Sequence, residues 1–209
     1  MDRRLGSGAC GTVGGMFVIG RPSEERLEQV LADMRAATVT YPEVGVTARP
    51  GDLPAGYHHV RATAELGHGD AVFAAAADGV RTWRLHRGQG FRVIPDDPPL
   101  VAGTDVVVDV PLVGVHVIAA CRVVWTVDDA DRVGFGYGTL PVHPESGEEA
   151  FVVERTPSGD VVVDVCAFSR PRHALVRLGG PIARRQQRKA TRGYVDALRD
   201  HVATALRGG

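Results

Sequence analysis

Two kinds of periodicity divide the first half of the chain into elements. Apolar residues recur at three- and four-residue spacing over residues 23–37 and 70–84, which predicts two amphipathic helices. Ser23 is a suitable N-cap for the first, because its hydroxyl can accept a hydrogen bond from the first turn. Alternation of apolar and polar residues over residues 58–66 predicts a strand, whereas residues 38–53, rich in proline and glycine, predict a loop.

Five strand-like segments and a long helix follow in the second half. Residues 128–131 and 157–160 are short turns, and strands joined by such turns must be antiparallel neighbours. After Gly179-Gly180-Pro181, the apolar spacing predicts a helix from Ile182 to about Leu206. The predicted strands are residues 104–110, 115–127, 133–140, 149–155 and 161–168.

This order of elements predicts an α+β fold. A curved antiparallel sheet of about six strands would wrap the long C-terminal helix, which is the helix-grip architecture. In the segment 134–139, Phe135, Tyr137 and Thr139 alternate with three glycines, and a glycine face lets a sheet bend or lets another backbone approach. The alternative is a twisted glycine-rich strand without a cavity.

We expect one domain over residues 21–209, preceded by a flexible tail over residues 1–20. The tail contains a G-x-G-x-x-G run from Gly6 to Gly11, but no predicted strand precedes it and no predicted helix follows directly. A dinucleotide-binding fingerprint needs both.

Composition narrows the function classes. The formal net charge of −1 gives no general attraction to nucleic acid or to an anionic membrane, and no apolar run is long enough for a transmembrane helix. Cys10, Cys121 and Cys166 form no C-x-x-C pair, so neither a zinc site nor a disulfide framework is indicated. We therefore expect a reduced, cytoplasmic protein with no cofactor, no nucleic-acid partner and no membrane span; the oligomeric state is left open.

Aromatic residues at predicted core positions are candidates for lining a cavity. The alternating face of residues 117–127, which includes Trp125, is apolar throughout and should meet the core. Tyr137 and Thr139 differ from the rest because a buried hydroxyl needs a hydrogen-bonding partner, from the protein or from a ligand. The alternative is that the aromatic residues only pack the core. The candidate lining residues are Trp83, Trp125, Phe135, Tyr137, Phe151, Val163 and Tyr194.

The segment from His143 to Glu149 concentrates one histidine and three carboxylates in seven residues. At the mouth of a cavity, His143 and Glu145 could act as a general base and its orienting partner. The same groups could bind a divalent metal ion. The third interpretation is a solvated acidic loop that links two strands.

Basic residues crowd the first half of the last predicted helix, where cations oppose the helix dipole. They could pair with the nearby glutamates, bind an anionic ligand or nucleic acid, or face solvent. Arg122 and Arg170 are the candidates for holding an anionic end of a ligand, and His86 is expected to face water. The basic residues of the helix are Arg184, Arg185, Arg188, Lys189 and Arg192.

Five motifs carry a resemblance to a known family. They are Tyr41-Pro42-Glu43-Val44-Gly45-x-Thr47, Leu66-Gly67-x-Gly69, Cys121-Arg122-Val123-Val124, Gly134-Phe135-x-Tyr137-Gly138-Thr139-Leu140-Pro141-x-His143-Pro144-Glu145-x-Gly147-Glu148-Glu149 and Ala167-Phe168-Ser169-Arg170-Pro171. These motifs resemble one uncharacterised family, the domain of unknown function numbered nineteen-ninety (DUF1990). The resemblance spans about residues 26–199 and brings no known catalytic residues with it. The strand order of the family is similar to that of the helix-grip proteins of the START, Bet v 1 and polyketide-cyclase group, which implies a central cavity for hydrophobic molecules.

The sequence thus leads to a first hypothesis and two rivals. The first is a protein that binds a small, largely apolar molecule with a polar or anionic end and catalyses a cyclisation, a dehydration or another proton transfer. Tyr137 and Thr139 would orient the ligand, and His143 and Glu145 would move the proton. The rivals are a non-catalytic carrier or regulatory binding module, and an interaction protein that uses the basic helix. The sequence leaves open the ligand and whether any reaction occurs.

Overall fold

The computed structural model describes residues 16–49, 51, 53–172 and 180–208, and within the last range it describes side chains from residue 190 onward. The helices are α1 (Glu24–Met34), the short 3-10 helix η2 (Val46–Ala48), α2 (Asp70–Arg81), α3 (Arg84–Arg87) and α5 (Gly180–Gly208). The strands are β1 (Phe17–Ile19), β2 (His58–His68), β3 (Arg92–Ile94), β4 (Asp105–Leu112), β5 (Val115–Asp128), β6 (Arg132–Thr139), β7 (Glu145–Arg155) and β8 (Asp160–Pro171).

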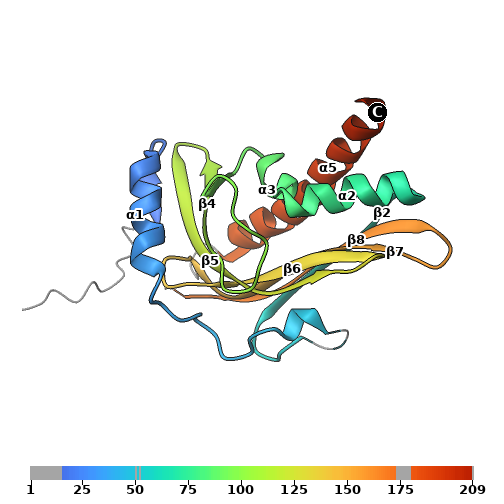
Figure 1. The fold of residues 1–209 in the computed structure, drawn as a ribbon. Helices are drawn as coiled ribbons and strands as arrows, with labels where there is room; N and C mark the ends of the chain where they lie inside the picture. The colour runs from blue at the N-terminus through green and yellow to red at the C-terminus, as the bar shows by residue number, and fades with distance from the viewer. Residues whose placement is uncertain (1–15, 50, 52, 173–179, 209) are drawn as a thin grey trace, which may run out of the picture.

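One antiparallel sheet contains every described strand, in the order β2-β8-β7-β6-β5-β4-β3, and β1 also pairs with β5. The sheet bends along its length, and α2, α3 and α5 lie on its inner side (Figure 1). On the outer side, α1 packs beside β4 and β5, and the segment with η2 lies below β6 and β7. The predicted helix-grip fold is confirmed, with eight strands where about six were expected. No helix in the described part of the chain is both long and apolar enough to cross a membrane.

The N-terminal segment departs from the prediction of a tail over residues 1–20. Phe17–Ile19 pairs with Val115–Val117 of β5, and Met16 is buried, so the prediction is wrong for residues 16–19. Residues 1–15, with the glycine run and Cys10, lie outside the described residues. Three residues are too few to show a clear alternation of apolar and polar side chains. The same limit applies to β3, which the sequence pattern does not predict.

The predicted second helix is interrupted at Trp83. This residue has φ 58° and ψ 27°, a left-handed conformation that a bulky side chain rarely adopts. The chain turns there from α2 into α3, and it buries Trp83, Leu85 and His86 completely. The expectation that His86 faces water is therefore wrong.

A bulge in β5 changes which side chains point inward. Val123 is paired with Tyr137, but Trp125 is paired with Gly136, so Val124 is an extra residue on this strand. After the bulge, Trp125 lies on the outer face, where its indole N–H donates a hydrogen bond to Thr47 Oγ1 at 2.9 Å. The prediction that Trp125 lines the inner cavity is wrong for this reason.

The glycine face of β6 also points outward. A Cβ atom on Gly136 would overlap the indole of Trp125, and one on Gly138 would overlap the phenol of Tyr41. The glycines therefore make room for two aromatic side chains of the outer layer.

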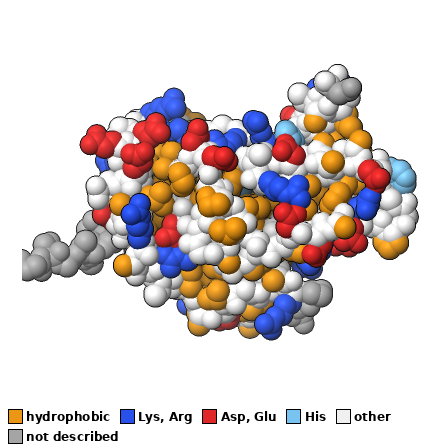
Figure 2. Space-filling view, viewed as in Figure 1, with side chains coloured by type: hydrophobic (Ala, Val, Ile, Leu, Met, Phe, Trp, Pro, Cys, Tyr) orange, Lys and Arg blue, Asp and Glu red, His pale blue; other side chains and the backbone are white. Residues whose placement is uncertain are grey.

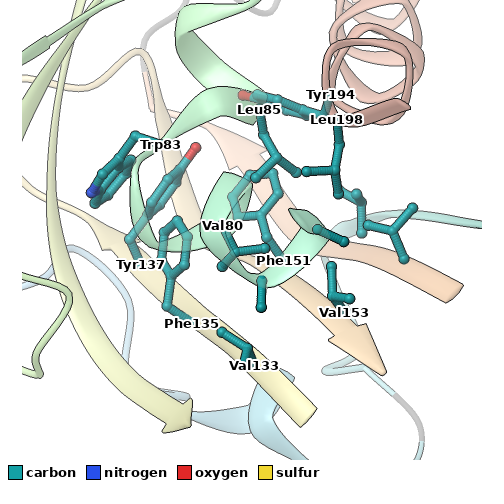
Figure 3. Packing of buried hydrophobic residues seen from close by; sticks show 14 of the residues in the cluster. Val80, Trp83, Leu85, Val133, Phe135, Tyr137, Phe151, Val153, Tyr194 and Leu198 are labelled. Atoms are coloured by element: carbon teal, nitrogen blue, oxygen red, sulfur yellow. The ribbon is translucent and has the colours of Figure 1, made fainter. Parts of the chain in front are cut away.

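The inner face of the sheet packs tightly against the helices. Phe135 and Phe151 point from β6 and β7 toward α2 and α3, and Leu198 meets them from α5 (Figure 3). These three side chains and Trp83 have no exposed surface. Aromatic rings contact one another throughout this cluster; the centroids of Trp83 and Phe135, for example, are 4.6 Å apart.

Glu148 fixes the outer loop to the sheet. Its side chain is buried, yet its carboxylate accepts hydrogen bonds from the Tyr41 hydroxyl at 2.7 Å, the Gly45 N–H at 2.7 Å and the Thr47 N–H at 2.9 Å. The Thr47 hydroxyl is a fourth donor. A buried carboxylate is stable only with such a full set of donors, so this one residue determines where residues 41–47 lie.

We expect Glu148→Gln to lower the free energy of unfolding by about 3 kcal/mol. The amide replaces one acceptor oxygen with an NH₂ group that faces donors, and it removes the charge that strengthens the remaining bonds. Urea denaturation measures the change. Glu154→Gln, on the same face of β7 but half exposed, is the control and should stay within about 0.5 kcal/mol. An equal effect of the two substitutions would contradict this role of Glu148.

Candidate functional site

A cavity of about 110 Å³ lies on the inner face, where β6, β7 and β8 approach the middle of α5. Carboxyl, hydroxyl and imidazole groups dominate its wall, and small apolar side chains complete it. The lining residues are Tyr137, Thr139, His143, Glu145, Gly147, Glu148, Glu149, Ala167, Ser169, Ala190 and Tyr194.

Glu149 is the central polar group of this cavity. Its Oε2 accepts a hydrogen bond from the Tyr137 hydroxyl at 2.8 Å, and the hydroxyl of Tyr194 is also hydrogen-bonded to it. Burial raises the pKa of Glu149 from 4.5 to about 7; the tyrosine hydrogen bonds oppose the increase, and the negative charge of Glu145 adds to it. Near neutral pH, this carboxyl group can therefore both accept and release a proton.

The alternation along β7 explains the position of Glu149. Counting back in steps of two from the core residues Val153 and Phe151 leads to Glu149, Gly147 and Glu145, so all five belong to the inner face. Glu148 falls on the outer face, where it binds the loop described above. Because β7 begins at Glu145, the interpretation of residues 143–149 as a solvated acidic loop is wrong.

His143 and Glu145 contact each other through the main chain. His143 Nδ1 lies 3.0 Å from the Glu145 main-chain nitrogen and 3.1 Å from the Glu145 carbonyl oxygen, so the main chain of Glu145 occupies Nδ1 in either tautomer of the ring. Burial lowers the pKa of His143 to about 4 and raises that of the Glu145 carboxyl, whose charged form is favoured by a hydrogen bond with Ser169. The carboxylate therefore does not orient the imidazole as predicted, although both residues line the cavity.

His86 belongs to the same network, although no sequence pattern indicates this. Its Nε2 lies 3.2 Å from the Tyr137 hydroxyl, and burial lowers its pKa to about 3, so the ring is neutral. The hydroxyls of Tyr137 and Tyr194 are neutral too, because burial and then the charge of Glu149 raise their pKa values well above the usual range.

Thr139 lines the cavity, but its hydroxyl is already occupied. Its Oγ1 lies 2.6 Å from Thr40 Oγ1 and accepts the Gly147 N–H at 3.1 Å. Of the residues predicted to contact the ligand, Thr139 and Tyr194 are at the cavity wall. Trp83, Phe135 and Phe151 instead form the packed core beside it.

Arg122 and Arg170 do not line the cavity. Arg122 forms a two-point ion pair with Asp105, at 2.6 and 2.8 Å, and donates to the carbonyl oxygens of Arg35 and Ala37 at the end of α1. Arg170 is exposed and stacks over the ring of Tyr57 at 4.8 Å. Neither guanidinium is therefore placed to hold an anionic ligand there.

The remaining charged features give no further candidate. The side chains of Arg184, Arg185, Arg188 and Lys189 lie outside the described residues, and Arg192 is exposed. No three His, Cys, Asp or Glu side chains are grouped as metal ligands would be, as far as the structure describes them. Acidic and basic side chains are interspersed on the face shown in Figure 2.

A wider hollow of about 470 Å³ lies on the outer face of the sheet. Two of its three arginines face acidic partners: Arg61 lies 3.7 Å from Asp164, and Arg132 lies 3.8 Å from Glu154. Paired surface charges of this kind are typical of a solvated sheet face.

The model of the family described as Domain of unknown function (DUF1990) matches residues 40–197, so the chain belongs to this family. A UPF0548 protein from Deinococcus radiodurans is 30% identical over 196 residues, which cover 88% of this chain and 97% of that protein. A UPF0548 protein from Arabidopsis thaliana is 27% identical over 200 residues, covering 88% and 96%.

Solved structures share the fold at low sequence identity. A hypothetical protein from Helicobacter pylori has a TM-score of 0.54 and 11% identity, covering 79% of this chain and 96% of its own. The di-domain ARO/CYC StfQ from the steffimycin biosynthetic pathway has a TM-score of 0.51 and 10% identity, covering 71% of this chain and 51% of its own. At such identities the likeness concerns the fold.

We expect Glu149 to make the protein less stable as the pH rises. Its folded-state pKa of about 7 exceeds the ordinary 4.5, so the folded state binds the proton more tightly, and stability is lost between these two pH values. Glu149→Gln imitates the protonated form. The free energy of unfolding of this variant, relative to that of the unmodified protein, should increase between pH 4.5 and 7. Above pH 7 the difference should stay constant at about 3 kcal/mol.

Urea denaturation at several pH values measures this difference. Glu154→Gln is the matched control, because it removes a half-exposed carboxylate from the outer face of the same strand. A flat difference for Glu149→Gln would show that the carboxyl group titrates normally.

Proposed function

We propose that this DUF1990 protein binds a small molecule in the inner cavity and that Glu149 transfers a proton to or from it. The observation that supports this proposal is the hydrogen-bonded state of Glu149, a cavity-wall carboxyl group with two tyrosine hydroxyls and a pKa of about 7. A general acid or base works best when its pKa is close to the working pH.

The groups around Glu149 suit a substrate with a carbonyl or hydroxyl end. His143 is neutral, and in the tautomer whose Nδ1 accepts the Glu145 N–H it would donate a hydrogen bond from Nε2 to a carbonyl oxygen. Polarisation of the carbonyl would acidify the adjacent C–H group, from which the Glu149 carboxylate could remove a proton. Tyr137 and Tyr194 would hold the carboxylate in place.

The dimensions of the cavity restrict the ligand. A volume of about 110 Å³ is below the roughly 300 Å³ at which drug-sized ligands begin to fit. Ala167, the cross-strand neighbour of Glu149, and Ala190 add a small apolar surface to the cavity wall. We therefore infer a compact ligand with an apolar body against the alanines and its carbonyl end toward Glu149.

The shared fold of StfQ agrees with this chemistry. StfQ is named as an ARO/CYC protein, and an aldol ring closure joins a carbonyl carbon to a carbon next to a second carbonyl group, from which a proton has to be removed. In our proposal, Glu149 would remove this proton in the present chain. Cyclisation and dehydration share this proton transfer, so the proposal covers both.

The test is proton exchange in D₂O. We would incubate the protein with a panel of small cyclic ketones and β-hydroxy ketones and follow the C–H signals next to the carbonyl by NMR. Glu149→Gln should slow the catalysed exchange by about 100-fold or more, because it removes the base. His143→Ala should also slow exchange while leaving ligand binding, followed by thermal shift, nearly unchanged.

The matched control is Glu154→Gln, a carboxylate on the same strand but on the outer face, which should leave exchange intact. Binding without any exchange would favour the carrier interpretation. If neither binding nor exchange occurs across the panel, or if Glu149→Gln exchanges at the normal rate, the proposed role of Glu149 is wrong.

A further inference from the structure

His86 is an unusual buried residue, because only one of its two ring nitrogens has a partner. Nε2 lies 3.2 Å from the Tyr137 hydroxyl, whereas Nδ1 is buried with no hydrogen bond. The side chain is fully enclosed by aromatic rings, with centroids 5.0 Å from Phe151 and 4.9 Å from Tyr194. A half-satisfied polar group in an apolar core is unfavourable, so packing alone does not explain the presence of an imidazole.

The contacts of Tyr137 determine which atom carries each proton. The Tyr137 hydroxyl donates to the ionised Glu149 carboxylate, at 2.8 Å from Oε2, which leaves its oxygen able to accept a hydrogen bond from His86. The tautomer of His86 that supplies this hydrogen bond carries its proton on Nε2 and has Nδ1 as the unpartnered acceptor. The hydrogen bonds therefore run in one direction, from the His86 ring through Tyr137 to the Glu149 carboxylate.

Local backbone geometry holds His86 in this place. The chain enters α3 through the left-handed conformation of Trp83, three residues before His86, and Trp83 has the only positive φ among the described non-glycine residues. Unfavourable conformations of this kind persist where the surrounding structure needs them, and they are concentrated at functional sites. The indole of Trp83 is also parallel to the Tyr137 ring, with an interplanar angle of 4° and ring centroids 6.3 Å apart.

We propose that His86 is a positioning residue for Glu149, which it controls through the hydroxyl of Tyr137. The imidazole fixes the rotation of this hydroxyl and polarises it, so that its proton points at the carboxylate. His86 does not touch the cavity itself. The proposal rests on the role of Glu149 given above, but it concerns a coupling that exists with or without a substrate.

Other titratable groups around Glu149 have to be separated from this effect. They come from each element packed around the carboxylate: Tyr137 on β6, Glu145 on β7, Tyr194 on α5 and Cys121 on β5. Only Tyr137 has a hydrogen bond to His86. A change in the His86 signal that follows the titration of Glu149 and requires the Tyr137 hydroxyl therefore identifies the proposed coupling through Tyr137.

The experiment is a pH titration of the full chain labelled with ¹⁵N-histidine and ¹³C-glutamate. NMR gives the tautomer of His86, assigned by comparison with His86→Phe, and the midpoint of the Glu149 titration. We expect His86 to stay neutral with its proton on Nε2 from pH 5 to 9. The chemical shift of its Nε2 should change with pH at the same midpoint as the Glu149 titration. Tyr137→Phe and Glu149→Gln should each abolish that change.

The substitution His86→Phe supplies a second readout. Loss of the polarising donor should raise the midpoint of the Glu149 titration by about 0.1 to 0.6 pH units. This range corresponds to the share of the free energy of a charged hydrogen bond that cooperativity contributes. His201→Gln is the control, since His201 pairs with Asp78 on the surface and should not change the midpoint.

A His86 signal that does not follow Glu149, a proton on Nδ1 at neutral pH, or an unchanged Glu149 midpoint in a folded His86→Phe protein would overturn the proposal. None of these measurements needs a ligand. Failure of the exchange assay would therefore leave this test intact, and the reverse also holds.

Discussion

The two-residue period of β7 is the constraint on which the rest of the structure depends. It sends the adjacent carboxylates of Glu148 and Glu149 to opposite faces of one sheet. Glu148 accepts four donors from the outer loop and fixes that layer, whereas Glu149 meets two tyrosine hydroxyls at the inner cavity. A shift of one residue in the pairing of β7 would exchange the two groups and leave each without its partners.

Most of the architecture could be predicted from the sequence, because its long elements have clear periods. The strand at residues 58–66, the hairpins around residues 128–131 and 157–160, and the last helix agree with β2, β5 to β8 and α5. The errors arise where the period breaks. A single extra residue, Val124, turns Trp125 outward, and one left-handed residue, Trp83, divides a predicted helix and buries His86. Neither the bulge nor the left-handed residue can be recognised from the spacing of apolar residues in the sequence.

The candidate site was predicted in part for the same physical reason. Tyr137, Thr139, His143 and Glu145 are at the cavity wall because the pattern of β6 and the motif after it places them there, and Tyr194 because it lies on the apolar stripe of α5. Glu149 is not among the predicted site residues because the sequence pattern assigns it to the acidic segment 143–149, although the alternation from Phe151 backward puts it on the inner face. Arg122 could not be assigned from sequence, since its partners, Asp105 and the end of α1, are distant in the chain.

The two glutamates also differ in how completely hydrogen bonds compensate the burial of their carboxyl groups. Glu148 has backbone and side-chain donors for both oxygens, so its burial is compensated. Glu149, Glu145 and His86 are less completely satisfied, and burial disfavours the charged form of each. Natural sequences retain such groups at sites where the altered proton affinity is useful. All three lie on the inner face or directly behind it, so the buried groups whose charged form is disfavoured are concentrated on the inner side of the sheet.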